Sequence, residues 1–474
     1  MSFYTPARSL PKRFRLVLAS FLQRPGLPFA DALTEEAIHK AFDDEGADFA
    51  DDPEAVYTPA MTLWAFLSQV LFKDEQRSCV AAVARVIVLL VALKRGPCSG
   101  NTGAYCRARG KLSETVIRRL AVNLADGCER QLDETRLWHG RHVQLVDGTT
   151  VSMPDTPENQ QAYPQPAQQP PGLGFPMARV LVLLSLATGM LTDMAIGPYA
   201  GKETGETALL RQLLERFRPG DILLGDRYFC SYFMIALLQE MGVDFVTRVH
   251  QLRTVDFRRG RRLGKGDHVV QWQLPEKPKW MDPQTYDRMP ASIEVREVHV
   301  RVSEPGFRTE SFVVVTTLTD AATYANDDIA ELYHSRWQVE LDIRAIKITM
   351  GMDVLRCKTP EMVRKEMWTC LLAYNLIRQA LLQSARKAGV SPRALSFTAA
   401  VQSIAASWLV IVLSDDALAT LLIDAASVSL AAHVVGHRPG RLEPRAIKRR
   451  PKPHDLLTQP RAQARAEMIE AKSP

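Results

Sequence analysis

The sequence lacks the cysteine patterns that build secreted mini-domains or zinc sites. Its seven cysteines lie far apart, their number is odd, and no CxxC pair occurs. This distribution excludes a disulfide framework and a zinc ribbon, and it favours reduced thiols in the cytoplasm.

Long apolar runs are also missing. The strongest, CVAAVARVIVLLVAL at 79–93, carries Arg85 and is shorter than the roughly 20 residues that a membrane-spanning helix needs. It predicts a buried core helix. The N-terminal segment has neither a long apolar region nor a small-residue cleavage site, so we expect no signal peptide and no membrane association.

The charge balance is modest, with 59 Lys and Arg against 53 Asp and Glu among 474 residues. A net charge of +6 permits nucleic acid as a partner without requiring it. Positive charge is concentrated in 251–266 and in 438–453, and the second segment also holds four prolines. Such a segment is typical of an extended arm that follows a polyanion.

The first 135 residues show apolar positions at helical spacing, interrupted by Gly, Ser and Asn over 98–113. We expect a loop there, followed by a helix capped at Ser113. Arg107, Arg109 and Lys111 lie in this interruption and are candidates for holding DNA phosphates. A solvated turn is the alternative.

Short β-branched and apolar runs begin near residue 140. The pattern predicts a strand, an Asp-Gly turn and a second strand over 142–153, a third strand at 178–189, a helix at 206–217, a strand at 221–226, a helix at 231–242 and a strand at 244–250. This order is that of a ribonuclease-H-like α/β core.

The expected fold class is therefore α/β, with a ribonuclease-H-like core, a β-rich insertion and helical flanks. The predicted boundaries are a helical DNA-binding domain at 1–135, the core at 136–250 and 311–352, the insertion at 251–310, a helical region at 353–435 and a basic extended tail at 436–474.

The segment YHSRWQVELDIRAIK at 333–347 places four polar residues on one helix face. At about 100° per residue of an α-helix, Tyr333, Arg336, Glu340 and Lys347 share an arc of about 60°. A solvated face with an Arg336–Glu340 ion pair is the alternative.

Two aspartates follow predicted strands of the core. Asp147 ends the first strand and Asp226 follows the one at 221–226, and open α/β sheets place their sites at such carboxyl ends. Each aspartate also has a simpler interpretation: Asp147 as a turn residue, and Asp226 as a helix cap. Only a shared site explains why both, with Glu340, fall within reach of one another in this topology.

Three carboxylates without a histidine cluster suit Mg²⁺ or Mn²⁺. Two such ions, about 4 Å apart, activate water and stabilise the leaving oxygen of a phosphodiester. Arg336 and Lys347 would then neutralise phosphate, the arginine through its bidentate fork.

The pattern Y-x2-R-x3-E-x6-K formed by these residues resembles the signature of the bacterial insertion-sequence-four family of DDE transposases. VDGTT at 146–150 and GDRYF at 225–229 resemble the two aspartate blocks of that family, and EPRAIKRRPKP resembles its basic ending. The match extends from about residue 100 to 455.

The resemblance implies a Mg²⁺-dependent enzyme that binds the terminal inverted repeats of its own element. It would pair them as a homodimer, cut them free through hairpin intermediates and join them to target DNA. Tyr333, Arg336 and Lys347 would contact DNA near the cleaved end. The protein would act in the bacterial cytoplasm and associate with the nucleoid when bound to DNA. Family members that form hairpins stack a flipped base on an aromatic residue, for which Phe312, Trp272 and Trp280 are candidates beside ordinary core packing.

Two other functions share these residues. One is a ribonuclease-H-fold nuclease that cuts structured DNA without strand transfer. The other is a DNA-binding regulator without catalysis, although retention of all three acids, Asp147, Asp226 and Glu340, argues against a decayed site.

Overall fold

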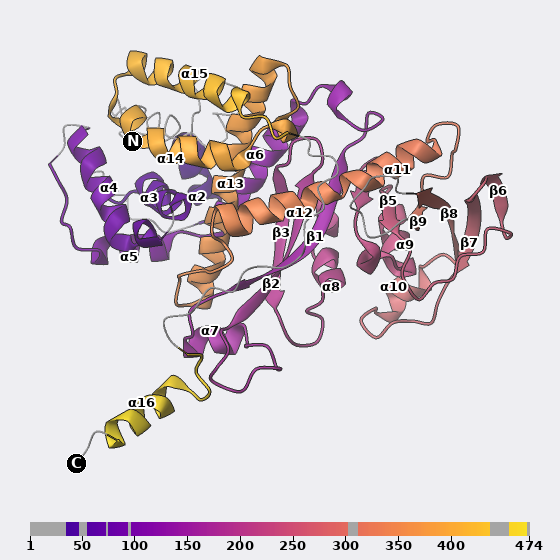
Figure 1. Ribbon diagram of the computed structural model, residues 1–474, viewed down its shortest axis with the longest axis horizontal. Helices are drawn as coiled ribbons and strands as arrows, with labels where there is room; N and C mark the ends of the chain where they lie inside the picture. The colour runs from indigo at the N-terminus through magenta and orange to yellow at the C-terminus, as the bar shows by residue number, and fades with distance from the viewer. Residues whose placement is uncertain are drawn as a thin grey trace, which may run out of the picture.

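The computed structural model describes residues 35–46, 55–72, 74–92, 96–301, 311–436 and 455–471. A block of helices, a long mixed sheet and a small β-rich end follow one another across the molecule (Figure 1). No helix within these ranges is long and apolar enough to cross a membrane. The N-terminal segment in which we expect no signal peptide lies outside the described residues, which begin at residue 35. The basic segment 438–453 lies outside them as well.

One nine-stranded sheet, ordered β3-β2-β1-β4-β5-β9-β8-β7-β6, runs through the protein. Its strands are β1 (Val143–Ser152), β2 (Met177–Ser185), β3 (Leu191–Pro198), β4 (Ile222–Leu224), β5 (Asp244–Arg248), β6 (Arg261–Gly264), β7 (Asp267–Gln273), β8 (Ser292–Arg301) and β9 (Ser311–Thr316). β2 runs antiparallel to β1 and β3, whereas β4 and β5 run parallel to β1. These five strands form the predicted ribonuclease-H-like core.

β1 is one continuous strand, so the predicted hairpin at Asp147–Gly148 is wrong. Every residue from Gln144 to Ser152 pairs in unbroken register with β2. The β-branched residues after Gly148 favour an extended chain, and β2 offers a partner for every backbone group along the way. β3 is a strand that the sequence analysis does not predict. Because the two strands predicted over 142–153 are one, β3 brings the core strands back to the predicted five.

The segment between β5 and β9 adds β6, β7 and β8 to the same sheet. β8 pairs antiparallel with β9 and with β7, and β9 in turn pairs with β5. A short helix, α10 (Pro283–Asp287), lies between β7 and β8. The insertion is β-rich as predicted, and it continues the core sheet.

Alternate residues of β1 enter two different cores. Val143 and Leu145 join the larger one, whereas Val146 joins the smaller one together with residues of the helical segments behind the sheet. Those segments are α8 (Glu206–Arg211), η4 (Leu214–Arg216), η5 (Arg227–Phe229) and α9 (Tyr232–Glu240). Because side chains alternate along a strand, Asp147 faces the larger core. The helix predicted at 206–217 is thus two shorter pieces.

Helices from both ends of the chain cover that larger core. The N-terminal ones are α2 (Glu35–Asp44), α3 (Pro59–Leu71), η2 (Asp74–Arg77), α4 (Cys79–Ala92), α5 (Gly103–Lys111), α6 (Glu114–Arg130) and η3 (Glu134–Arg136), and α7 (Pro157–Ala162) follows β1. The later ones are α13 (Pro360–Ala388), η7 (Pro392–Ala394), α14 (Phe397–Leu413) and α15 (Asp416–Ala432). Asn375 joins the two groups, since its amide donates to the carbonyls of Ala121 and Leu191 at 2.9 Å each.

The segment 326–349 is not the single straight helix that we expect. It consists of α11 (Asn326–Ser335), α12 (Trp337–Arg344) and a π-helix, η6 (Ala345–Thr349). Arg336 joins the first two, and the N–H of Val339 bonds to its carbonyl three residues back. Tyr333, Glu340 and Lys347 therefore lie in three different elements. Single π-turns are frequent at functional sites.

Two further expectations differ from the structure. Residues 103–111 form α5, whereas we expect a loop, and Ser113 caps the next helix as predicted by accepting from Val116 N–H. Residues 461–470 form α16 (Arg461–Glu470), although we expect an extended tail. Good helix formers follow Pro460 there, which suits a helix start. α4 buries only one face, whereas its apolar run predicts a buried core helix: Val80, Val88 and Val91 are exposed.

Candidate active site

Asp147 and Asp226 lie at the same level of two neighbouring parallel strands. Leu145 of β1 is level with Leu224 of β4, and each aspartate follows its leucine by two residues. β4 ends at Leu224, so Asp226 stands just beyond the strand. The two aspartates therefore lie level on neighbouring strands, with the correction that Asp147 lies within its strand, and their joint role stays a prediction.

Backbone hydrogen bonds orient both carboxylates. The N–H of Gly148 donates to Asp147 Oδ1 at 2.8 Å, and the N–H of Tyr228 donates to Asp226 Oδ1 at 2.8 Å. Asp226 therefore caps η5, and the cap of α9 is Ser231. The hydroxyl of Thr247 on β5 also donates to the carbonyl of Asp226 at 2.5 Å.

Burial and neighbouring carboxylates act on the ionisation of Asp147. The pKa of Asp147 is raised to about 6, mainly by burial; the charges of Asp226 and Glu206 also raise it, whereas the Gly148 N–H and Arg336 lower it. A buried carboxylate with such neighbours favours a cation. The oxygen-only donor set fits Mg²⁺ or Mn²⁺ and does not fit zinc.

Glu340 is ion-paired with Arg336. The guanidinium Nη2 lies 2.8 Å from Glu340 Oε1, and the two side chains are 20% and 40% exposed. Arg336 also acts electrostatically on Asp147, and α12 packs on β1. Within the described ranges, no three His, Cys, Asp or Glu side chains are grouped closely enough to hold a metal ion. The two aspartates lie level on neighbouring strands and act electrostatically on one another, whereas Glu340 is ion-paired with Arg336.

Glu206 is an acidic neighbour that the sequence analysis missed. Its carboxylate fills the space beside Gly148: a Cβ added to that glycine would lie 2.2 Å from Glu206 Oε1. Burial raises the pKa of Glu206, as does Asp226, while Arg179 lowers it. Its position at the start of α8, next to a glycine of the neighbouring strand, has no sequence signal of its own.

Comparison with known proteins decides what this site belongs to. Residues 138–376, just over half of the chain, match the family model described as the transposase DDE domain, and this range contains Asp147, Asp226 and Glu340. The chain belongs to the DDE transposase family.

Relatives agree with this assignment. The transposase InsG for insertion sequence element IS4 of Escherichia coli K12 is 28% identical over 358 residues, covering 73% of this chain and 76% of InsG. A putative transposase for element IS4SA of Synechocystis is 23% identical over 219 residues, covering 46% of this chain and 57% of the relative. The protein is an insertion-sequence DNA transposase. Among solved structures, the chain is distantly similar to piggyBac transposase in a synaptic complex with hairpin DNA, with a TM-score of 0.43 and 13% sequence identity. The superposition covers 92% of this chain and 90% of that one.

In the transposase, Tyr333 and Phe312 lie together beside the aspartates. Their ring centroids are 5.1 Å apart, and the guanidinium of Arg248 lies 5.4 Å from the Phe312 centroid. Burial raises the pKa of Tyr333. The charges of Arg336 and Arg248 lower it, and the charge of Asp226 raises it. The structure therefore brings Phe312 to the site from β9 and adds Arg248 from β5, which the sequence analysis did not single out.

The other predicted DNA-contacting residues differ in exposure. Lys347 is half-buried in the π-turn after α12, and Arg107 and Lys111 are exposed on α5. Arg109 is turned inward: it donates to Gln69 Oε1 at 3.1 Å and lies 5.0 Å from the ring centroid of Phe66. Its packing role follows from α5 being a helix with one buried face.

Neither predicted tryptophan of the insertion is free to stack on a base. Trp272 is buried and its Nε1 donates to Glu297 Oε1 at 3.2 Å. Trp280 is half-buried against Phe233, with the guanidinium of Arg211 3.9 Å from its centroid. Of the three aromatic candidates, Phe312 is the one beside the carboxylates.

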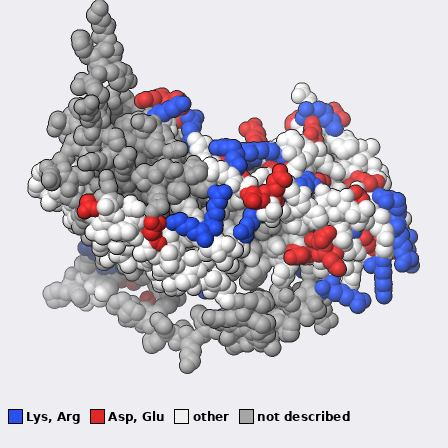
Figure 2. Space-filling model, turned by 90° about the horizontal axis from the view of Figure 1, so that it is seen from above, with Lys and Arg blue, Asp and Glu red and all other residues white. Residues whose placement is uncertain are grey.

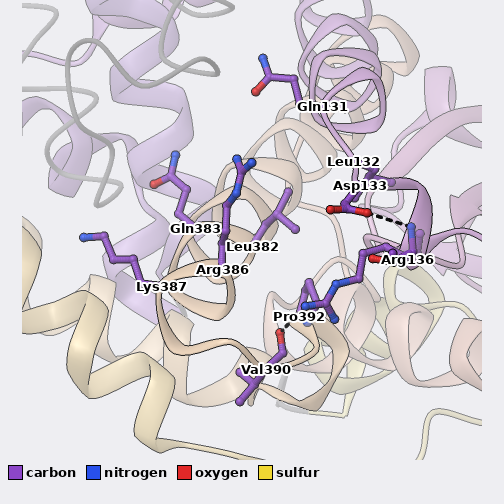
Figure 3. Close-up of a pocket in the computed structure, with 12 residues that line it drawn as sticks. Gln131, Leu132, Asp133, Arg136, Leu382, Gln383, Arg386, Lys387, Val390 and Pro392 are labelled. Atoms are coloured by element: carbon purple, nitrogen blue, oxygen red, sulfur yellow. Dashed lines mark hydrogen bonds between the residues drawn. The ribbon is translucent and has the colours of Figure 1, made fainter.

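A cavity of about 380 Å³ lies elsewhere, between the end of α6 and the end of α13 (Figure 3). It is bordered by Arg136, Arg386 and Lys387 and by one carboxylate, Asp133, which caps η3. Ala187, in the β2–β3 turn, also lines it, which places the cavity beyond the start of β1, whereas Asp147 lies in the middle of that strand. It offers no paired carboxylates for phosphoryl-transfer chemistry.

Proposed function

We propose that this transposase binds the terminal inverted repeats of its own element and cuts and joins DNA there, with Asp147, Asp226 and Glu340 as its catalytic carboxylates. The observation that carries this proposal is the level placement of the two aspartates on parallel strands, with Arg336, the ion-pair partner of Glu340, acting electrostatically on Asp147.

Asp147 and Asp226 would hold the metal, and Glu340 would join them after leaving Arg336. We expect two Mg²⁺ ions, which Mn²⁺ replaces; when bound, they supply an activated water and neutralise charge at the phosphodiester. Asp147 must lose its proton first, and its pKa of about 6 places this step just below neutral pH. Arg336, once released, is free to take a phosphate oxygen with its fork.

DNA would lie along the face that carries Tyr333, Arg336 and Lys347, with Arg248 and Phe312 beside the cut end. The β6 end adds Arg258 and Arg259, whose side chains are 90% and 84% exposed, and the exposed residues Arg261, Arg262 and Lys265. Figure 2 shows this group of Lys and Arg at the right-hand end of the molecule. Phosphate contacts of this kind position a duplex without reading its sequence.

The helical region at 1–135 would serve as a DNA-binding domain through Arg107 and Lys111, and two copies would pair the element ends as a homodimer on the bacterial nucleoid. Two copies are needed because each would bind one of the two element ends that are brought together. A gel-filtration and light-scattering comparison of the protein with and without end DNA tests this stoichiometry.

A labelled element end tests the catalytic assignment. We expect Mg²⁺-dependent cleavage by the wild-type protein and its loss in Asp147→Ala, Asp226→Ala and Glu340→Ala, while each variant still shifts the end DNA in a binding gel. Cleavage that survives in one variant removes that residue from the site. If Glu340→Ala cleaves and Glu206→Ala does not, the third ligand is Glu206.

Strand transfer separates transposition from simple cutting. Precleaved ends incubated with a supercoiled plasmid should become joined to it by their 3′ hydroxyls. Efficient cleavage without any joined product under these conditions would favour the structure-specific nuclease instead.

A further inference from the structure

Asp342 is a fully buried carboxylate on α12, the helix that carries Glu340. It lies on α12 two positions after Glu340, with no exposed side-chain surface. Arg378 of α13 binds one of its oxygens, and Arg393 of η7 binds the other at 2.8 Å. A buried charge of this kind is tolerated only when its partners satisfy it.

Both arginines are themselves fixed to the turn between β2 and β3. Arg393 donates to the carbonyl of Ser185 at 2.7 Å and also to that of Leu186. Arg378 donates to the hydroxyl of Tyr374 at 2.8 Å, and that hydroxyl donates to the carbonyl of Gly189 at 2.7 Å. Gly189 adopts a φ of +73°, and a Cβ there would lie 3.1 Å from Arg378 Cζ. The network therefore ends on backbone carbonyls at the end of β2 and in the β2–β3 turn.

This network links the two parts of the proposed active site. β2, which supplies the carbonyl of Ser185, pairs with β1 and places Val182 opposite Asp147. At about 100° per residue, a side chain two positions away points roughly 200° around the helix. When Asp342 is held inward, Glu340 must point away from the helical core, on the side where it meets Arg336.

We propose that Asp342 is a positioning residue that sets the rotation of α12, and thereby the direction of Glu340, through Arg378 and Arg393. The inference rests on the proposed catalytic role of Glu340. α12 has no other polar anchor of this depth among the residues that the structure describes, since Val339 is its second buried side chain. Apolar packing alone permits a helix to rotate by small angles, whereas two charged hydrogen bonds to one carboxylate fix its direction.

The first test is Asp342→Asn, which keeps the shape of the side chain and removes its charge. We expect the single-turnover cleavage rate at saturating DNA and Mg²⁺ to fall about 100-fold, because a misplacement of about 1 Å has that effect. The dissociation constant for end DNA should stay unchanged. Arg386→Gln is the matched control, since Arg386 is exposed on the same helix as Arg378 and should cleave at the wild-type rate. An unchanged rate in Asp342→Asn overturns the proposal.

A double-variant cycle with Glu340→Gln separates positioning from general stabilisation. The readout is Mn²⁺ affinity of the complex with precleaved end DNA, followed by the electron paramagnetic resonance signal of the free ion. If Asp342 acts through Glu340, Asp342→Asn weakens Mn²⁺ binding in the wild type and adds no loss in Glu340→Gln. An equal loss in both backgrounds means that Asp342 acts by another route, and the proposal fails.

The same cycle distinguishes failure of the catalytic assignment of Glu340 from failure of the positioning role of Asp342. If Glu340→Gln changes neither Mn²⁺ affinity nor cleavage, Glu340 is not a metal ligand, and the positioning role fails with it. If Glu340→Gln abolishes cleavage and Asp342→Asn does not alter it, the positioning role alone fails.

Arg393 provides a variant that keeps the buried carboxylate paired. Arg393→Gln leaves Asp342 bound to Arg378, so the protein should fold, as checked by its thermal unfolding midpoint. We expect a cleavage rate between those of the wild type and Asp342→Asn, with partial rescue in Arg393→Lys. Equal rates for the wild type and Arg393→Gln would contradict the proposed route through η7.

Discussion

Arg336 donates a hydrogen bond to Glu340 across 2.8 Å while its charge lowers the pKa of Asp147. One guanidinium thus serves both parts of the proposed carboxylate set before any ion or DNA is bound. It holds the Glu340 carboxylate and compensates part of the charge at Asp147. Binding of cations at the aspartates would remove the need for that compensation and release the arginine toward phosphate.

Removal of this charge should alter both catalysis and its pH dependence. In Arg336→Met we expect cleavage to fall about 100-fold or more, since loss of one donor to a reacting phosphate has that effect. The pKa of Asp147 should also rise, so the acid limb of the rate profile moves to higher pH. Arg344→Met on the same helix, exposed, is the control. An unshifted acid limb would show that Arg336 does not act on Asp147.

The raised pKa of Asp147 predicts a pH-dependent stability of the metal-free protein. Between its ordinary value of 3.8 and about 6, the folded state binds more protons than the unfolded chain. The free energy of unfolding therefore falls as pH rises through that window, by about 3 kcal/mol, and stays lowered above it. Asp147→Asn should lack this fall and be the more stable protein at pH 7.

Urea unfolding at pH 4 and pH 7, with chelator present, measures this difference. Added Mg²⁺ should stabilise the wild type at pH 7 more than Asp147→Asn. A variant that is no more stable than the wild type at pH 7 would show that the site does not strain the ionised carboxylate.

Close packing between Gly148 and Glu206 predicts a specific steric effect. In Gly148→Ala the new methyl would meet the Glu206 carboxylate, so we expect a loss of about 1–3 kcal/mol in the free energy of unfolding. Glu206→Ala in the same chain should recover most of it. Gly110→Ala, where no atom lies within 4 Å, is the control. Additive effects of the two substitutions would contradict the contact.

Trp272 of the insertion and Phe312 of β9 should differ in role. Trp272→Phe removes the hydrogen bond to buried Glu297 and should lower the free energy of unfolding by about 1–3 kcal/mol, with cleavage unchanged. Phe312→Ala, beside Tyr333, should instead slow cleavage or hairpin formation. Both are measured on the same labelled end, and an effect of Trp272→Phe on cleavage at full folding would reverse the assignment.

The exposed cations near β6 should appear in the salt dependence of DNA binding. Replacement of Arg259 and Arg262 by alanine should reduce the slope of log affinity against log salt by about 2, because each lost phosphate contact removes about 1. The matched pair Arg386→Ala and Lys387→Ala lies by the separate cavity and should leave the slope unchanged. Equal reductions in both pairs would indicate only a loss of net charge.

The sequence was sufficient to predict the elements whose signals are local. β4, α9 and β5 lie where the apolar runs place them, and Asp226 follows β4 as expected. The fate of Asp147–Gly148 was not predictable in this way, because an Asp-Gly pair suits a turn and only the presence of β2 along its whole length makes it a strand. The contact of Glu206 with Gly148 joins distant positions and has no local pattern.

Helical periodicity likewise placed the polar residues of 333–347 on one face but assumed an unbroken α-helix. The junction at Arg336 and the π-turn at 345–349 depend on hydrogen bonds that a residue count does not contain. The Arg336–Glu340 ion pair, which is the ordinary alternative for this helix face, is present and is compatible with the proposed site. Whether Glu340 turns to the metal stays a prediction.

Continuity of the sheet from β3 to β6 has a consequence for protein engineering. The insertion strand β8 covers the backbone edge of β9, which in turn borders β5. A minimal enzyme made by deleting the insertion would expose an unpaired strand edge next to the catalytic core, and such edges recruit other chains and promote aggregation. Any shortened version of this protein must therefore keep β8 or cap that edge with charged residues.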